Sequence, residues 1–90
     1  MPREPAPTAE NLADLCLTHL AQDAELLAEF MGIAGYSPAG LRAAIRSPQL
    51  QHGLIDYFAQ NEPLLLAFCD SNALKPEQFM RVWAKLNPSG

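Results

Sequence analysis

The sequence predicts an all-α fold, a compact bundle of five or six short helices. Apolar residues recur at helical spacing along most of the chain, and no stretch shows the alternation of apolar and polar residues that marks a strand. Prolines also follow closely on residues that cap helices, as in the Ser-Pro pairs that begin at Ser37 and Ser47. Proline fits the first turn of a helix because its fixed φ is helical and its missing N–H has no partner there.

Six helices are expected, at residues 9–21, 24–34, 38–46, 48–60, 62–72 and 76–86. Thr8 and Asp23 are the expected N-caps of the first two, and the proline-containing sequences begin the other four. The fifth helix contains the run LLLAF at residues 64–68 and is apolar on all sides. A helix of that kind is usually buried, so we expect the fifth helix to form the centre of the bundle.

The composition is typical of one folded domain: of the 90 residues, 49% are hydrophobic and 18% are charged. We place a single helical domain at residues 8–87, between a flexible N-terminal arm (1–7) that contains three prolines and a short C-terminal tail (88–90). The sequence has neither the basic start and apolar run of a signal peptide nor a run of about 20 apolar residues. We therefore expect a cytoplasmic protein with no membrane partner.

Two stretches of the chain resemble each other. Residues 23–30 (DAELLAEF) and 61–68 (NEPLLLAF) lie 38 residues apart. The same shift aligns three further pairs, Leu12 with Leu50, Leu20 with Phe58, and Pro38 with Pro76. We favour a duplicated three-helix unit, at 8–45 and 46–83, whose two copies pack around one core. The alternative is a chance match, because helices rich in leucine and alanine align easily.

Longer runs of the sequence carry a family resemblance. They are LAQDAELLAEFMGIAGYSPAGLR and LIDYFAQNEPLLLAFCDSNALKPEQF, in which LLLAF stands eight residues before a proline. With these runs the chain resembles, over roughly residues 8–86, a family of short, uncharacterised alphaproteobacterial proteins catalogued as a domain of unknown function. The resemblance implies a bacterial protein with an all-helical domain. It implies no activity, cofactor or site residue.

The sequence contains no convincing catalytic or metal-binding set. Cys16 and His19 lie three apart on one helix, and His52 and Asp56 lie four apart, but a structural zinc site needs four ligands. Cys16 and Cys69 stand among apolar residues, so we expect two buried thiols and no disulfide, metal or cofactor. No serine or cysteine is framed by glycines as a nucleophile. We expect no enzymatic activity.

The charge pattern is the feature most suggestive of a partner. Four of the six basic residues form two pairs with i, i+4 spacing on the third helix of each unit: Arg42 with Arg46, and Arg81 with Lys85. The two pairs could form the sides of a groove for an acidic amphipathic helix, with Trp83 and Tyr36 as apolar anchors. Trp83 could equally belong to the core, which we favour, and the four cations could be ordinary solvated charges.

These features favour a non-enzymatic module for protein–protein interactions, which binds a protein, a peptide or a second copy of itself. The alternative is a nucleic-acid-associated regulatory protein that uses the same four cations. The net charge of −4 argues against that alternative, because it repels a phosphate backbone at long range. A metal-binding protein is the least favoured class.

Overall fold

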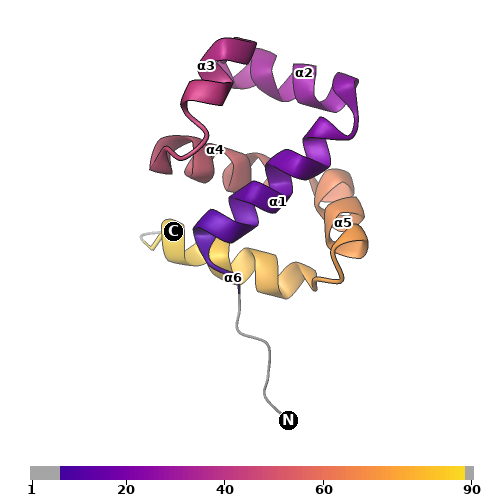
Figure 1. Ribbon diagram of the computed structural model, residues 1–90. Helices are drawn as coiled ribbons and strands as arrows, with labels where there is room; N and C mark the ends of the chain where they lie inside the picture. Colours follow the sequence, from indigo (N-terminus) through magenta and orange to yellow (C-terminus); the bar gives the residue numbers. More distant parts are fainter. Residues whose placement is uncertain (1–6, 89–90) are drawn as a thin grey trace.

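The computed structural model describes residues 7–88, and all of the regular structure over that range is helical (Figure 1). This confirms the predicted all-α class. The helices are α1 (Ala9–Ala21), α2 (Ala24–Ala34), α3 (Pro38–Ala43), α4 (Pro48–Ala59), α5 (Glu62–Ser71) and α6 (Pro76–Leu86). The expected arm (1–7) and tail (88–90) lie outside the described residues, except for Pro7 and Pro88.

The predicted helix ends agree with the structure to within one residue, except that the third helix ends at Ala43 instead of residue 46. Residues 44–46 form a turn, closed by a hydrogen bond of 2.8 Å from the Ser47 N–H to the Ala44 carbonyl. A residue that precedes a proline avoids the helical conformation, and Ser47 is extended with φ −73° and ψ 133°. The chain therefore leaves the helix before Pro48, and Arg46 lies in the turn.

Side-chain caps begin most of the helices. The cap residues are Thr8, Asp23, Ser37, Ser47 and Asn61, each of which accepts a hydrogen bond from a backbone N–H of the first turn. The predicted caps at Thr8 and Asp23 are thereby confirmed. Such a cap typically stabilises a helix by about 1 kcal/mol. At the start of α6 the direction is reversed, because the Gln78 Oε1 accepts the Lys75 N–H at 2.9 Å.

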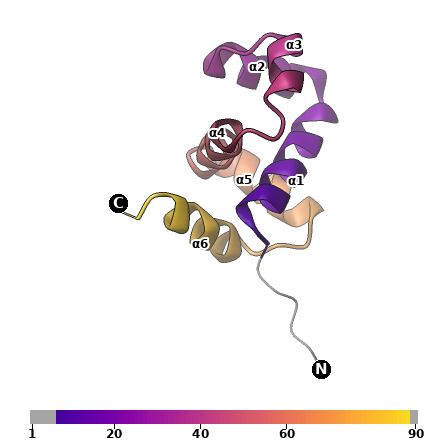
Figure 2. The same cartoon turned by 60° about the vertical axis from the view of Figure 1, so that its left-hand side comes forward.

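The centre of the bundle is α4, not α5. This helix packs against α1, α5 and α6 (Figures 1 and 2) and buries Leu50, Leu54, Ile55 and Phe58. The expectation that α5 is buried on all sides is wrong, because α5 lies at the side of the bundle. Its inner face buries four residues, whereas Leu66 on the outer side is 48% exposed. Apolarity around a helix thus did not identify the helix at the centre of the bundle.

Aromatic rings join α4, α5 and α6. Phe58, Phe68 and Phe79 are fully buried, and their ring centroids lie 5.2 to 6.3 Å apart. Cys16 and Cys69 are buried as well, with free thiols, which confirms the expected apolar role of both cysteines. Burial raises the pKa of both thiols, and the proximity of Cys69 raises that of Cys16 further. The thiols therefore stay protonated at neutral pH.

Some contacts of one half recur 38 residues later in the other half. The Tyr36 N–H donates to the Met31 carbonyl at 2.9 Å after Gly35 in the left-handed conformation, and the Leu74 N–H donates to the Cys69 carbonyl at 2.9 Å after Ala73 in the same conformation. Across the halves, Tyr57 meets Phe30 edge to face at 5.1 Å, and His19 meets Phe68 edge to face at 5.6 Å. In both sets, adding 38 to the residue numbers of one half gives those of the other.

Candidate functional site

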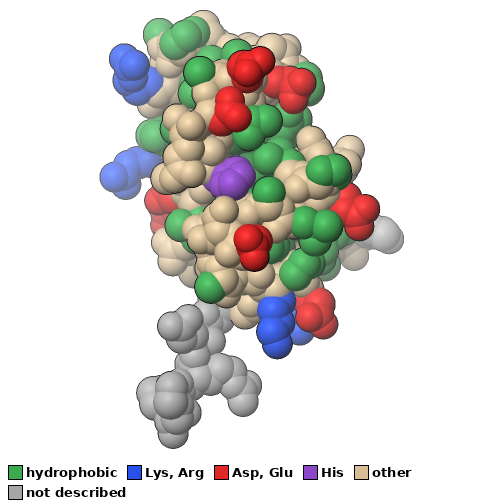
Figure 3. Space-filling view, turned by 90° about the vertical axis from the view of Figure 1, so that its right-hand side faces the viewer, with side chains coloured by type: hydrophobic (Ala, Val, Ile, Leu, Met, Phe, Trp, Pro, Cys, Tyr) green, Lys and Arg blue, Asp and Glu red, His purple; other side chains and the backbone are tan. Residues whose placement is uncertain are grey.

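The structure does not bring the two predicted basic pairs together. Arg42 lies on α3 and Arg46 in the following turn, whereas Arg81 and Lys85 lie on α6, and all four side chains are exposed. Helices α3 and α6 lie on opposite sides of α4 (Figures 1 and 2). Figure 3 shows one face of the molecule, on which the cationic side chains lie at separate edges. The hypothesis of one groove with a basic pair on each side is therefore wrong, because α4 separates its two sides.

The two candidate aromatic anchors have different surroundings. Trp83 is half-buried against the core, and its indole N–H donates to the Asp56 Oδ1 at 3.0 Å. Its polar group is therefore already paired within the chain. Tyr36 is also half-buried and stacks on Phe30 with a centroid distance of 6.5 Å. Of the two, Tyr36 lines an open groove beside α2 and α4.

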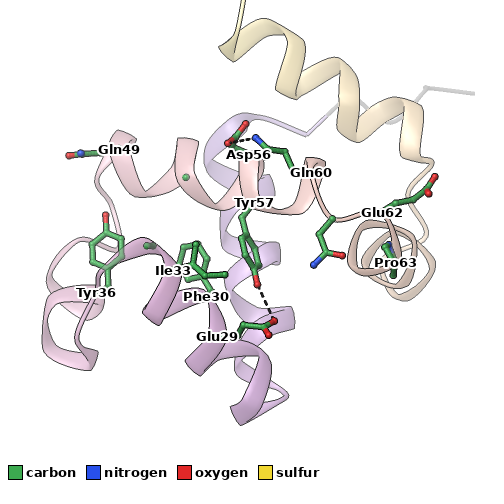
Figure 4. Close-up of a pocket in the computed structure, with 13 residues that line it drawn as sticks. Glu29, Phe30, Ile33, Tyr36, Gln49, Asp56, Tyr57, Gln60, Glu62 and Pro63 are labelled. Carbon is green, nitrogen blue, oxygen red and sulfur yellow. Dashed lines mark hydrogen bonds between the residues drawn. The ribbon is translucent and has the colours of Figure 1, made fainter.

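This groove, which we call the α2–α4 groove, has a volume of about 770 Å³ and is open to solvent (Figure 4). It lies between α2 and α4 and reaches the beginning of α5. The residues that shape it are Glu29, Phe30, Ile33, Tyr36, Gln49, Asp56, Tyr57, Gln60, Glu62 and Pro63, together with Ala34, Gly53 and Asn61. All the charged residues among them are carboxylates.

Aromatic residues form the floor of the α2–α4 groove. Phe30 is buried beneath the edge of the Tyr57 ring, and Tyr36 stacks beside it. Ile33, which follows Phe30 by almost one helical turn, is 70% exposed (Figure 4). Ile33 was not among the predicted site residues, although it stands outside the apolar stripe of Leu27, Phe30 and Met31. An isoleucine outside the buried stripe of an amphipathic helix was the signal that could have found it.

Hydrogen bonds hold two of the carboxylates at the edge of the groove. The Tyr57 hydroxyl donates to the Glu29 Oε1 at 3.4 Å, and the Gln60 side-chain amide donates to the Asp56 Oδ2 at 2.8 Å (Figure 4). Burial raises the pKa of Tyr57, and the negative charge of Glu29 raises it further. The tyrosine therefore remains a protonated donor near neutral pH. Glu62, in the first turn of α5, is exposed.

A second hollow, which we call the α1–α3 trough, lies among α1, α2 and α3 and has a volume of about 250 Å³. Its lining is apolar apart from one arginine: Leu17, Ala21, Leu27, Met31, Pro38, Leu41, Arg42 and Ile45. Ile45 is 43% exposed. Arg46 does not line the trough, because it lies in a separate small depression with Glu10 and Asp14.

The considered metal ligands do not gather at one place. Within residues 7–88, no group of three or more His, Cys, Asp or Glu side chains is arranged to hold a metal ion. His19 packs edge-on against the rings of Phe58 and Phe68, at 6.1 and 5.6 Å. His52 lies exposed on α4. No helix in the described part of the chain has the length and apolarity needed to cross a membrane.

Comparison with known protein families identifies the family to which the chain belongs. The family described as proteins of unknown function, DUF3572, matches residues 6–89. The chain belongs to the DUF3572 family. No curated protein and no solved structure matches it. The family assignment agrees with the resemblance noted from the sequence, and it attaches no activity to either hollow of this DUF3572 protein.

Proposed function

We propose that this DUF3572 protein is a non-enzymatic interaction module that binds a cationic amphipathic segment of another protein in the α2–α4 groove. The observation that carries the proposal is the 70% exposure of Ile33 beside the aromatic floor of the groove. The charged residues that line the groove around it are all carboxylates. An apolar side chain flanked by like charges suits a partner that offers an apolar residue between lysines or arginines.

The energetics favour such a partner. Covering most of an isoleucine side chain stabilises a complex by about 1 to 2 kcal/mol. The acidic edge adds mainly speed, because complementary charges accelerate association at low salt. The net charge of −4 acts in the same direction on a cationic segment.

The chemistry of the groove supports binding over catalysis. Asp56 already accepts hydrogen bonds from Gln60 and Trp83, and Glu29 accepts one from Tyr57. A tyrosine whose pKa lies above its ordinary value is a poor base or nucleophile near neutral pH. These groups are arranged to hold one another in place.

Two designed peptides test the proposal. Each has about 16 residues, with leucines at i, i+3, i+4 and i+7 and with either lysines (the Lys-peptide) or glutamates (the Glu-peptide) on the opposite face. Binding of the fluorescently labelled peptides is followed by anisotropy at low salt. We expect the Lys-peptide to bind saturably. Ile33→Ser should weaken its affinity about fivefold, and Glu62→Gln should reduce the salt dependence of binding.

The matched control is Leu66→Ser, which removes an exposed apolar residue from the outer side of α5. It should leave the affinity for the Lys-peptide unchanged. Equal weakening by Ile33→Ser and Leu66→Ser would mean that the peptide adheres to any exposed apolar side chain. That result, or the absence of saturable binding, would exclude the α2–α4 groove as the site.

A further inference from the structure

The α1–α3 trough corresponds to a region that is closed in the second half of the chain. Adding 38 to the numbers of its apolar residues gives residues around α6. The pairs are Leu17 and Ile55, Leu27 and Leu65, Met31 and Cys69, Leu41 and Phe79, and Ile45 and Trp83. In the first three pairs, the residue of the first half is partly exposed and its counterpart is buried. The positions that form an exposed hollow in the first half thus form a buried interior in the second half.

The difference follows from side-chain size and helix length. The larger Phe79 and Trp83 on α6 stand where the first half has Leu41 on α3 and Ile45 in the turn after α3. Helix α6 is 11 residues long and packs on α1, α4 and α5, whereas α3 has 6 residues. Smaller side chains on a shorter helix leave volume unfilled, and unfilled apolar volume loses packing contacts. An apolar side chain from outside could restore those contacts.

We propose that the α1–α3 trough docks an acidic amphipathic helix of a partner protein, whose apolar side chains occupy the volume that Phe79 and Trp83 fill in the second half. The proposal does not depend on the α2–α4 groove. The apolar walls favour leucine-sized or aromatic side chains. At about 250 Å³ the trough lies below the range of about 300 to 1,000 Å³ that is usual for small-molecule pockets, so a few side chains suit it better.

The positive charge at the α1–α3 trough favours a partner with a negative charge at that point. Arg42 is the charged residue among those that line it. Arg46 lies instead in the separate depression that Glu10 and Asp14 also line. A carboxylate on the docked helix would therefore meet Arg42, next to the half-exposed Ile45. Arginine beside an apolar wall is a common combination at interface hot spots.

The Glu-peptide tests this proposal by fluorescence anisotropy at physiological salt, which screens the long-range repulsion by the net charge of −4. We expect saturable binding to the wild-type chain, weakened about tenfold by Arg42→Glu and about threefold by Ile45→Ser. Arg42→Lys keeps the charge and should retain most of the affinity. Arg81→Glu, at an exposed position on α6, is the matched control and should change the affinity by no more than its contribution to net charge.

Several results would overturn the proposal. Equal losses from Arg42→Glu and Arg81→Glu would indicate that the affinity follows the net charge of the chain and not a contact at Arg42. A dimer that Arg42→Glu dissociates in sedimentation would mean that a second copy occupies the trough. Ile33→Ser separates this proposal from the proposed function, because it should weaken the Lys-peptide and leave the Glu-peptide unaffected. Loss of both peptides in Ile33→Ser would exclude two independent sites.

Discussion

The two halves of the bundle, α1–α3 and α4–α6, follow the same helix pattern but are closed to different degrees. Helices α1, α2 and α3 begin at residues 9, 24 and 38, and α4, α5 and α6 begin at 48, 62 and 76. In the second half, Phe79 and Val82 of α6 are buried and complete a core with α4 and α5. In the first half, the corresponding position of Val82 is Ala44, which is only partly buried. The same succession of helices thus gives one closed half and one open half.

The difference indicates that side-chain volume at a few positions sets how completely the third helix of each half covers the apolar residues of the first two. The positions at the centre of the bundle are equally buried in both halves, as Leu12 and Leu50 show with 0% and 1% exposure. The divergence begins farther out, where the third helix of each half must cover the first two. The half with the smaller residues keeps the α1–α3 trough, which is one of the two candidate binding surfaces.

Leucine-to-alanine substitutions at equivalent positions test this difference directly. Leu65 is 6% exposed, whereas Leu27 is half-buried at the trough. We expect Leu65→Ala to lower the free energy of unfolding by about 3 kcal/mol and Leu27→Ala by about 1 kcal/mol, because only the first leaves a closed cavity. Urea unfolding followed by circular dichroism measures both values.

Leu12→Ala and Leu50→Ala supply the reference, since both leucines are buried at equivalent positions. These two variants should lose similar amounts of stability. If Leu27→Ala proved as costly as Leu65→Ala while the reference pair agreed, the first half would be as closed in solution as the second. The proposed difference in burial between the two halves would then be wrong.

Much of the fold followed from local rules that the sequence displays. Helix boundaries depended on caps such as Thr8 and Asp23 and on prolines, whose effects act within one turn. The end of α3 at Ala43 was not visible in the sequence, because the backbone preference of Ser47 before proline requires only that the helix end by residue 46. The centre of the bundle could not be predicted, because the number of neighbours of a helix is a tertiary property that apolarity alone does not fix.

The candidate site was predicted less completely. The exposure and spacing of the cations could be read from the sequence, but the position of α4 between α3 and α6 could not. Carboxylates at the α2–α4 groove come from three helices, with Glu29 on α2, Asp56 on α4 and Glu62 on α5. No sequence spacing brings such residues together, since the crossing of the helices does so. Ile33 was visible as an apolar residue outside the stripe of α2.

The cysteines differ from their counterparts in the other half and make stability depend on pH. Cys16 stands where the second half has Leu54, which cannot ionise. Burial, and then the nearby Cys69, raise the pKa of Cys16 above its ordinary value of 9.0. The unfolded chain therefore releases the thiol proton at lower pH than the folded chain. The contribution of the protonated Cys16 thiol to the free energy of unfolding is complete below pH 9 and is lost as pH rises above it. We expect the ionisation of Cys16 in the unfolded chain to lower the free energy of unfolding at pH 10 by about 1.4 kcal/mol.

Urea unfolding at pH 8 and pH 10 under reducing conditions measures this loss. Cys16→Ala removes the ionisable group, so the variant should lose less stability than the wild type between the two pH values, although its packing defect lowers stability at both. The raised pKa of Tyr57 gives the same sign of change from about pH 10 upward and is common to both chains. Equal pH dependence in the two chains would show that the Cys16 thiol ionises as readily when folded.

The smallest expected effect concerns the two left-handed residues that end α2 and the α5 segment. Gly35 has φ 81° and its counterpart Ala73 has φ 53°, a conformation that costs a residue with a Cβ about 1 kcal/mol. A Cβ at Gly35 would touch no other group within 4 Å, so Gly35→Ala should lose this backbone term less the entropy that alanine saves in the unfolded chain, about 0.5 kcal/mol net. Ala73→Gly should gain about 0.5 kcal/mol, because the freedom of glycine in the unfolded chain offsets part of the relief. Thermal unfolding of both variants checks the opposite signs, and destabilisation by Ala73→Gly would show that the two helix ends are not equivalent.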